Sequence, residues 1–421
     1  MGHIRSIAIK AVSAILTLAL IPVTVWAAPK EIVLHNFNDN GKDALAPYAG
    51  LIIDTAGNLY GATPYGGTYN VGTVFELSPQ TGGNWTEKVL HSFGGRNDGA
   101  SLYATPVLDA AGNLYGPTYY GGSGCNTYGC GTVYELTPQA NGKWTERVLH
   151  DFNSNNGDGF WPFGGLIFDP AGNLYGTTVQ GGAHRCIGGC GTVFELSKAG
   201  EKWTEEIVHD FHENGTGGLY PSDALIIDSA GNLYGAAGGG KGGGVVFELV
   251  PTTGGGWTEH VLHSFSQYGK TGDGPGHIIF DAAGNIYGTT RGGGTYGAGT
   301  VFELTPAVGG GWTEKVLHNF GNGNDGVHAY GGVIFDATGN LYGTTYNGGN
   351  STACTNGCGV VYELVHGVDG SWSEKILHDF GSGHDGALPY SGLTIDGEGH
   401  LYGTTSSGGV YHEGTVFEIV P

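Results

Sequence analysis

The sequence predicts an all-β protein, a seven-bladed β-propeller built from four-stranded antiparallel blades. Three observations predict this fold class. Short strings of residues recur seven times along the chain, each unit has the alternation and turn residues of short strands without a helical period, and the two ends of the chain carry complementary parts of one unit. The same composition excludes collagen, because the 84 glycines follow no three-residue period, and excludes simple disorder, because 39% of the residues are hydrophobic.

Three recurring strings mark the units. Asn-Leu-Tyr-Gly or a close variant recurs every 53 to 60 residues, at Asn58, Asn113, Asn173, Asn232, Asn285, Asn340 and His400. Gly-Thr-Val-Phe-Glu-Leu or a variant begins at Gly72, Gly131, Gly191, Gly244, Gly299, Gly359 and Gly414. Trp-Thr-Glu-x-Val-Leu-His-x-Phe has only six copies with the tryptophan, at Trp85, Trp144, Trp203, Trp257, Trp312 and Trp372.

The seventh copy of the third string stands at the other end of the chain. Residues 31–37 repeat it without the tryptophan, before the first full unit, whereas the last unit ends at Pro421 without it. An open solenoid would leave half a unit unpaired at each end. We therefore predict a closed ring in which residues 32–37 pair with residues 416–419.

The first unit shows the predicted strands in order: 51–54, 58–63, 73–77 and 86–93. Between the first two, Asp54 and Gly57 provide hairpin chemistry, since the carboxylate caps backbone N–H groups and the glycine accepts a positive φ. In the last strand, strict alternation places Trp85, Glu87, Val89, His91 and Phe93 on one face and Thr86, Lys88, Leu90 and Ser92 on the other.

The histidine of the last strand recurs in every unit, as His35, His91, His150, His209, His263, His318 and His378. Seven identical histidines are compatible with a metal ring or with a hydrogen bond inside each blade. Because the outermost strands lie at the rim, one per blade, we expect the hydrogen bond and no metal.

The N-terminal segment has the pattern of a signal peptide. Arg5 and Lys10 precede an apolar run over residues 11–26, and cleavage is expected after Ala27. The alternative, an uncleaved anchor, is disfavoured because the run is short for a bilayer span. We expect residues 1–27 to be removed and residues 28–421 to form a single soluble propeller domain that is secreted, either to the periplasm or outside the cell.

The net charge restricts the partners that this protein can bind, and the cysteines indicate the compartment in which it folds. A net charge of -22 disfavours nucleic acid and anionic membrane surfaces as partners. Six cysteines form three close pairs, which in an oxidising compartment predict short-range disulfides: Cys125 with Cys130, Cys186 with Cys190, and Cys354 with Cys358. A four-cysteine zinc site is the alternative, but it would leave the third pair unused.

The string D-x-x-G-N-L-Y-G-T-T-x-x-G-G followed by G-T-V-F-E-L resembles the GloVer (Gloeo/Verruco) tandem repeat of exported bacterial proteins that have a choice of anchor. The resemblance covers the mature chain in seven copies. It implies export and a propeller-like ring, and it transfers no catalytic motif. Since no anchoring segment follows Pro421 in this sequence, we expect the chain to depart from the anchored pattern.

Ligands of propellers bind mostly at one mouth of the axial channel, so departures from the repeat there are candidate site residues. Aromatic residues precede the innermost strands and follow the second strands, and Trp161 has no counterpart in the other repeats. They either stack on sugar rings or plug the channel. The candidate ligand-binding residues are Trp161, Phe160, Tyr119, Tyr346, Tyr48, Tyr103 and Tyr390.

Acids recur ahead of the innermost strands, at Asp43, Asp98, Asp158, Asp325 and Asp385. Their oxygens could hold Ca²⁺, but four of them form Asp-Gly turns, so loop capping is the preferred interpretation. We expect no cofactor.

Basic residues in this acidic chain are candidates for catalysis. Arg291 falls at a variable position near Lys241, His277 and His328 of neighbouring units, and His184 with Arg185 lies in the loop that contains Cys186. Beside Tyr330, the group Arg291, His277 and His328 could hold an acidic sugar and move a proton, as in a lyase.

The sequence leaves enzymatic activity open. The preferred function is a monomeric exported propeller that binds an extracellular glycan or peptide at the channel mouth. The alternatives are a polysaccharide lyase or hydrolase at the same mouth and a scaffold for protein-protein interaction.

Overall fold

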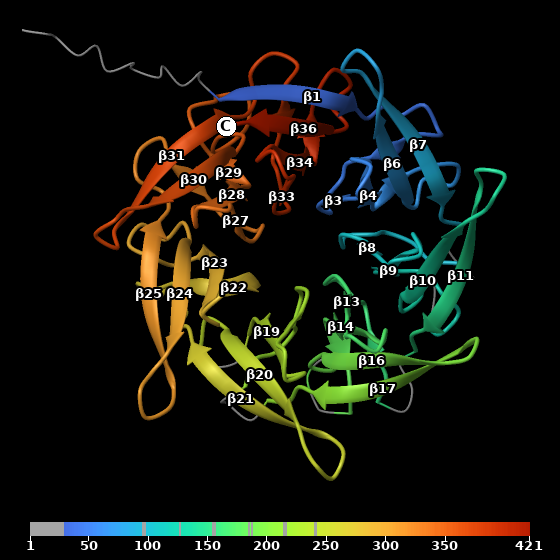
Figure 1. Ribbon diagram of the computed structural model, residues 1–421, viewed down its shortest axis with the longest axis vertical. Coiled ribbons are helices and arrows are strands. Elements are labelled where there is room, and N and C mark those ends of the chain that lie inside the picture. The colour runs from blue at the N-terminus through green and yellow to red at the C-terminus, as the bar shows by residue number, and fades with distance from the viewer. Residues whose placement is uncertain are drawn as a thin grey trace, which may run out of the picture.

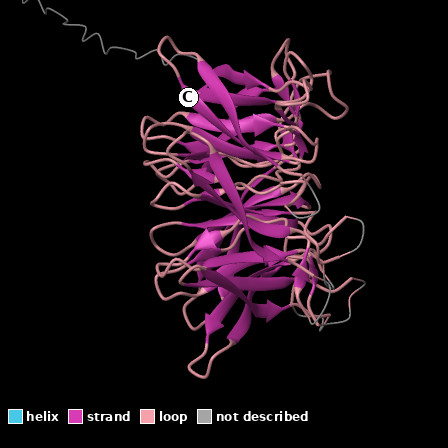
Figure 2. Ribbon diagram, turned by 90° about the vertical axis from the view of Figure 1, so that its right-hand side faces the viewer, coloured by secondary structure: helices cyan, strands magenta, loops and turns pink. Residues whose placement is uncertain are grey.

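The ring is visible in the computed structural model, which describes residues 29–94, 98–125, 128–153, 157–183, 186, 188–213, 217–239 and 242–421. Seven four-stranded antiparallel sheets are arranged around one axis, and the described residues contain no helix (Figure 1). Seen from the side, the strands form a disc with loops on both faces (Figure 2). The predicted signal peptide and three candidate residues, His184, Arg185 and Lys241, lie outside the described residues.

The blades run from a short innermost strand to a long outermost one. Blades 1 to 4 are β3 (Ile52–Ile53), β4 (Leu59–Thr63), β6 (Thr73–Pro79) and β7 (Trp85–Ser92); β8 (Val107–Leu108), β9 (Leu114–Thr118), β10 (Thr132–Pro138) and β11 (Trp144–Asp151); β13 (Ile167–Phe168), β14 (Leu174–Thr178), β16 (Thr192–Ala199) and β17 (Lys202–Asp210); and β18 (Ile226–Ile227), β19 (Leu233–Ala237), β20 (Val245–Pro251) and β21 (Trp257–Ser264). Blades 5 to 7 are β22 (Asp273–Phe280), β23 (Ile286–Gly292), β24 (Thr300–Pro306) and β25 (Trp312–Asn319); β27 (Ile334–Phe335), β28 (Leu341–Thr345), β30 (Val360–His366) and β31 (Trp372–Asp379); and β33 (Thr394–Ile395), β34 (Leu401–Thr405), β36 (Thr415–Val420) and β1 (Lys30–Asn36).

Four two-stranded ribbons supplement the blades. Each pairs the loop ahead of an innermost strand with the loop after the second strand of the same blade. They are β2 (Ala44–Leu45) with β5 (Tyr65–Gly66), β12 (Gly159–Phe160) with β15 (Gln180–Gly181), β26 (Gly326–Val327) with β29 (Asn347–Gly348), and β32 (Gly386–Ala387) with β35 (Ser407–Gly408). These ribbons tie together the loops that could form a channel mouth.

The predicted closure of the ring is confirmed. β1 pairs antiparallel with β36, with Lys30 opposite Val420 and Val33 opposite Phe417, so the N-terminal strand is the outermost strand of the last blade (Figure 1). The Thr404 hydroxyl also donates to the Ala49 carbonyl across the same junction, at 2.8 Å.

The turn between the first two strands uses the predicted aspartate. Asp54 Oδ1 accepts hydrogen bonds from the backbone N–H groups of Ala56 and Asn58, at 2.8 and 2.9 Å. Asp54 Oδ2 accepts from the Tyr60 hydroxyl at 3.1 Å. These bonds hold the pKa of the Asp54 carboxyl below its usual range although partial burial opposes them. One carboxylate thus fixes both the turn and the tyrosine of the next strand.

The core consists of apolar layers between neighbouring blades. The buried ring of Phe93, which follows β7, packs against Tyr134 of blade 2 with centroids 5.1 Å apart. The glycine of the Asn-Leu-Tyr-Gly string makes room for such rings, because a Cβ at Gly61 would lie 2.5 Å from Phe75. Each blade therefore buries its apolar face only when a neighbour covers it.

The predicted alternation of the outermost strand is wrong beyond its middle. Phe75 lies opposite Val89, but Val74 lies opposite His91, so a β-bulge accommodates Leu90 as an extra residue. Leu90 is buried, whereas strict alternation placed it on the face opposite His91. The bulge recurs in all seven blades.

The predicted hydrogen bond of the recurring histidine within its own blade is also wrong. Nε2 of His91 lies 3.2 Å from Asp98 Oδ2, and Asp98 belongs to the loop that leads into the next blade. Asp98 Oδ2 also accepts from the backbone N–H of Gly94, at 2.9 Å, as loop capping predicts. The histidines therefore lie at the junctions between blades.

All three predicted disulfides are present, with Cα atoms 5.3, 5.1 and 5.1 Å apart in the order of the chain. No cysteine is free, which rules out the alternative zinc site. Three disulfides indicate an oxidising compartment. Among the described residues we found no helix with the length and apolar character needed to cross a bilayer.

Candidate functional site

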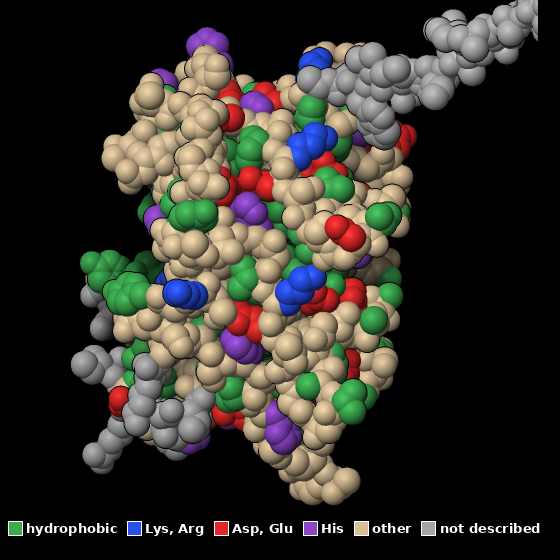
Figure 3. All heavy atoms as spheres, turned by 90° about the vertical axis from the view of Figure 1, so that its left-hand side faces the viewer, with side chains coloured by type: hydrophobic (Ala, Val, Ile, Leu, Met, Phe, Trp, Pro, Cys, Tyr) green, Lys and Arg blue, Asp and Glu red, His purple; other side chains and the backbone are tan. Residues whose placement is uncertain are grey.

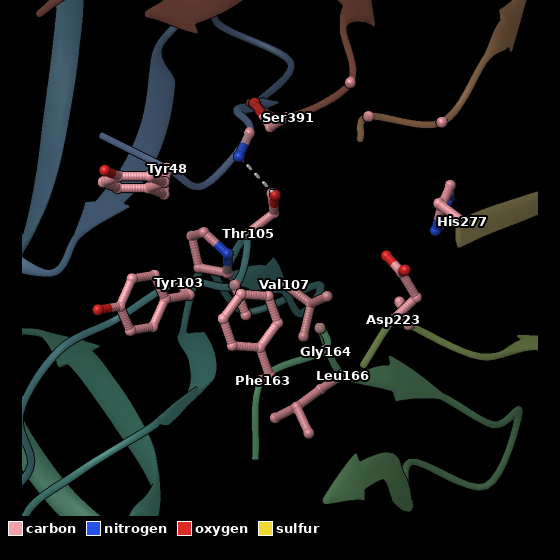
Figure 4. A pocket seen from close by; sticks show the side chains of 18 of the residues that line it. Tyr48, Tyr103, Thr105, Val107, Phe163, Gly164, Leu166, Asp223, His277 and Ser391 are labelled. Carbon is pink, nitrogen blue, oxygen red and sulfur yellow. Dashed lines mark hydrogen bonds between the residues drawn. The ribbon is translucent and has the colours of Figure 1, made fainter. Parts of the chain in front are cut away.

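An axial cavity of about 390 Å³ lies at the centre of the disc. Its walls are the innermost strands and the leading loops, by which we mean the segments that connect the outermost strand of one blade to the innermost strand of the next. All seven blades contribute to it, so the cavity exists only because the ring closes. Figure 4 shows Asp223 and His277 projecting into it from one side, opposite Tyr48 and Tyr103.

Five aromatic rings form an arc around this cavity, which we call the aromatic collar. Its members follow one another from blade to blade: Phe163, Tyr103, Tyr48, Tyr390 and Tyr330. Successive ring centroids are 5.1, 5.8, 5.2 and 4.8 Å apart, with the two terminal pairs stacked and the two central pairs edge to face. The collar is continuous because the same position of each leading loop carries an aromatic residue.

The collar is interrupted at blades 4 and 5. Ser222 takes the aromatic position in blade 4. In blade 5 the leading loop is one residue shorter between its proline, Pro275, and the turn aspartate, so the position is missing. Asp223, His277 and Arg291 lie around this interruption, which we call the polar gap.

Asp223 and Arg291 are electrostatically coupled across the polar gap. Burial raises the pKa of Asp223 to about 7, and the positive charge of Arg291 opposes this shift. The Arg291 side chain passes over Gly274, where a Cβ would lie 2.5 Å from Arg291 Nε. Glycine at this position therefore lets the guanidinium approach the cavity.

Two further titratable groups of the site, His277 and Tyr390, are neutral near pH 7. Burial lowers the pKa of His277, whose ring packs against Gly332 of the next blade. Burial and, to a smaller extent, the neighbouring Tyr330 raise the pKa of Tyr390 to about 12. His277 therefore offers a neutral imidazole and Tyr390 a hydroxyl donor, while Arg291 provides the positive charge.

A second cavity of about 280 Å³, the mouth cavity, adjoins the polar gap. It shares Phe163, Ser222, Asp223, Tyr330 and Tyr390 with the axial cavity and adds Arg291 and Tyr220. The two cavities thus meet at the ends of the collar and at the acidic group.

The predicted ligand-binding residues are brought together. Tyr119 stacks on Trp161 at 5.6 Å and meets Tyr103 of the collar at 5.6 Å, and Phe160 meets Trp161 edge to face at 5.3 Å. Tyr346 contacts two collar rings, at 5.5 Å and 5.9 Å. All seven candidates therefore belong to one network of touching rings, but only Tyr48, Tyr103 and Tyr390 line the axial cavity. The other four line neither cavity: Trp161, Phe160, Tyr119 and Tyr346.

Trp161 does have counterparts in the other repeats, contrary to the sequence-based expectation. Its backbone is left-handed, with φ 58°, and the equivalent position of every blade has φ between 48° and 66°: Ala46, Ser101, Tyr220, Gly274, His328 and Leu388. Hydrogen bonds from Trp161 N to the Cys130 carbonyl and from Val179 N to the Trp161 carbonyl hold this conformation. The equivalence of these positions could not be seen in the sequence, because their side chains differ although the backbone conformation is the same in every blade.

The candidate catalytic residues are brought together only in part. Arg291, His277 and Tyr330 line the two connected cavities. His328 lines neither cavity, and its Nδ1 lies 3.4 Å from Asn347 Oδ1. Sequence reasoning missed Asp223, although a signal existed, because the equivalent positions carry only small residues: Ala49, Ala104, Gly164, Gly276, Gly331 and Ser391.

The fold and its axial site define a seven-bladed β-propeller of tandem repeats. The model of the Gloeobacter/Verrucomicrobia repeat matches residues 24–237, 86–276 and 236–421, so the chain belongs to this repeat family, as its sequence motifs predicted. No curated protein matches the chain.

Solved structures resemble the fold at low sequence identity. The crystal structure of an ancestral GH74 enzyme matches 93% of this chain at 11% identity with a TM-score of 0.55, and this chain spans 51% of that structure. A protein of unknown function from Dyadobacter fermentans matches 94% of this chain and all of its own length at 13% identity, with a TM-score of 0.40. At 11% identity the likeness to the GH74 enzyme concerns the fold alone.

Proposed function

We propose that this protein is exported and binds a glycan in the axial and mouth cavities, with the aromatic collar as the stacking surface. The observation that carries the proposal is the five-ring collar facing a polar gap. Aromatic faces pack on the apolar C–H faces of sugar rings, while hydroxyl groups at the ring edges keep hydrogen-bonding partners. A cavity of about 390 Å³ is within the usual range of small-ligand sites.

The polar gap supports a glycan with acidic sugars. Arg291 offers a planar cation that can bind a carboxylate through two parallel hydrogen bonds. Asp223 shares the mouth cavity with Arg291, and its pKa of about 7 lets it be protonated when a carboxylate approaches. The gap thus discriminates between acidic and neutral sugars by charge, whereas the collar binds both.

A glycan array followed by calorimetry tests this function. We expect binding of one or more extracellular polysaccharides, weakened at least about tenfold by Tyr103→Ala, which removes a collar ring that lines the axial cavity. Tyr411→Ala is the matched control, because Tyr411 is 51% exposed and lies outside both cavities. No glycan binding, or equal affinity in the Tyr103→Ala variant, would contradict the proposal, and capture of peptides instead would assign the site to a different ligand class.

A second candidate function, polysaccharide lyase or hydrolase, is supported by one observation. A carboxyl group with a pKa near 7 beside an arginine can exchange a proton at neutral pH. In a lyase step Arg291 would neutralise the uronate carboxylate and Asp223 would take the proton from C5. The C4–O bond would then break, leaving a C4=C5 double bond, and Tyr330 would donate a proton to the leaving oxygen.

A lyase reaction produces a chromophore, so an absorbance measurement distinguishes lyase activity from glycan binding alone. Incubation with acidic polysaccharides would yield ultraviolet-absorbing unsaturated ends, and Arg291→Ala would abolish them. Binding without new chain ends, measured as reducing sugar, would exclude both the lyase and the hydrolase.

A further inference from the structure

Clusters of histidine, aspartate and glutamate lie at the rim of the disc, away from the axial site. At each of four junctions the histidine of one outermost strand meets the glutamate of the next outermost strand and the aspartate of the leading loop between them. Acidic and histidine side chains lie side by side along the rim in Figure 3. We call these the rim clusters: His35, Asp43 and Glu87; His150, Asp158 and Glu205; His318, Asp325 and Glu374; and His378, Asp385 and Glu31.

The donor atoms of each rim cluster are close enough to share one ion. One ligand atom from each of the three residues lies within 4.8 Å of the other two. Nε2 of His35 and Nε2 of His150 each lie 3.4 Å from an aspartate oxygen, and the other two clusters have 3.0 and 2.9 Å. Tetrahedral zinc with ligands about 2.0–2.2 Å away separates its donor atoms by about 3.3–3.6 Å.

Two rim clusters contain buried carboxylate oxygens that have no hydrogen-bond partner and that a bound cation would satisfy. The Asp385 side chain is 7% exposed, and its Oδ1 has no hydrogen-bond partner. Glu31 Oε1, from the same cluster, is also buried without a partner. Asp158, 9% exposed, repeats this situation in another cluster.

Among the described residues, the ion-pair partner of the carboxyl groups in each rim cluster is a histidine, which is positive only when it is protonated. Each rim cluster contains two carboxyl groups, and among the described residues no lysine or arginine forms an ion pair with any of them. Buried carboxylates are stable when they are paired or when they coordinate metal.

We propose that the rim clusters are divalent-metal sites that prefer zinc and link neighbouring outermost strands. One neutral imidazole with two carboxylates suits zinc, whereas calcium prefers more oxygen ligands and no nitrogen. The fourth position is open to water. Such ions would connect blade 7 with blade 1, where the ring closes, and three further pairs of blades: 2 with 3, 5 with 6, and 6 with 7.

Two other junctions of the same chain are natural controls. Gly217 replaces the aspartate next to blade 4, and a Cβ there would lie 3.2 Å from a carboxylate oxygen of Glu259. Thr271 replaces it next to blade 5, where its hydroxyl hydrogen-bonds Glu314. At the latter junction His263 Nε2 still lies 3.4 Å from Glu314 Oε2, so only the third ligand is missing.

Zinc stoichiometry tests the proposal directly. Protein stripped with chelator is dialysed at neutral pH against micromolar zinc, and bound metal is measured by mass spectrometry. We expect at least four ions per chain, one fewer for Asp385→Asn and for Glu31→Gln, and one more for Thr271→Asp. Glu314→Gln, at the incomplete junction, should leave the number unchanged.

Cobalt provides a second readout of the same sites. The visible absorption of bound cobalt should have the intensity typical of four-coordinate sites. In the two variants that lose an ion, Asp385→Asn and Glu31→Gln, this absorption should fall in proportion to the number of ions lost. Excess calcium should not displace zinc. Absence of bound zinc, or equal stoichiometry in Asp385→Asn and the wild type, would overturn the proposal. Should Asp385→Asn fail to fold, Glu31→Gln removes a ligand of the same cluster and decides the question.

Discussion

Tyr48 and Tyr390 meet edge to face, with ring centroids 5.2 Å apart, across the junction where the first blade adjoins the last. They are separated by almost the whole chain, and closure of the ring brings them together at the centre of the aromatic collar. The continuous collar therefore depends on closure of the ring. A substitution at this contact affects both the collar and the closure.

Ring stacking predicts different effects for two substitutions of Tyr48. Tyr48→Phe keeps the ring and should preserve glycan affinity within about threefold, whereas Tyr48→Ala removes one central ring and should weaken binding about tenfold or more. Calorimetry with the glycan found on the array measures both. Equal losses in the two variants would show that the hydroxyl, and not the ring face, contacts the ligand.

Asp223 should make stability depend on pH. Burial raises its pKa from the ordinary 3.8 to about 7, so the folded state holds this proton more tightly than the unfolded state does. The stabilisation is therefore fully present below about pH 3.8 and is lost as the pH rises through 7. Asp223→Asn, which resembles the protonated acid, should be more stable than the wild type at pH 8, on the order of 2 kcal/mol, and equal to it at pH 4.

Denaturant unfolding at several pH values checks this prediction. The comparison between the two proteins isolates Asp223, because all other titratable groups are common to both. Parallel stability curves for the wild type and Asp223→Asn would show that Asp223 is charged at neutral pH.

The closing blade should be as tightly packed as an internal one. Phe37 and Phe93 occupy equivalent positions after β1 and β7, and both are fully buried. Phe37 packs on Phe75 at 5.3 Å, and Phe93 packs on Tyr134 at 5.1 Å. Phe37→Ala and Phe93→Ala should each lower the free energy of unfolding by about 3–5 kcal/mol. A negligible loss for Phe37→Ala alone would mean that the N-terminal strand detaches in solution.

The turn aspartates should matter through their backbone hydrogen bonds. Asp54→Ala removes the acceptors for the N–H groups of Ala56 and Asn58 and for the Tyr60 hydroxyl, so we expect a loss of about 1–3 kcal/mol. Asp54→Asn retains one side-chain oxygen and should lose less. Thermal unfolding of the two variants checks the order, and equal losses would assign the effect to the charge, which both substitutions remove.

The candidate site was only partly predictable from sequence, for reasons that differ between residues. The aromatic positions were predictable because each occupies the same place in a repeat. Asp223 was not recognised as a site residue, because its place in the site depends on the missing aromatic position of blade 5. That position lies beside Asp223 only in the folded ring. His328 was assigned to the site by its proximity in the repeat order, but its ring faces Asn347.

The sequence by itself determined the seven units, the four strands of each, the disulfide pairs and the closure by the N-terminal strand, because these follow from local periodicity and from the count of repeated strings. Only the tertiary structure decided which side chains meet across blade junctions. The β-bulge that buries Leu90 and the pairing of each rim histidine with acids of the next blade depend on how adjacent sheets pack. A repeat specifies one blade, whereas the cavity and the rim clusters are properties of the contacts between blades.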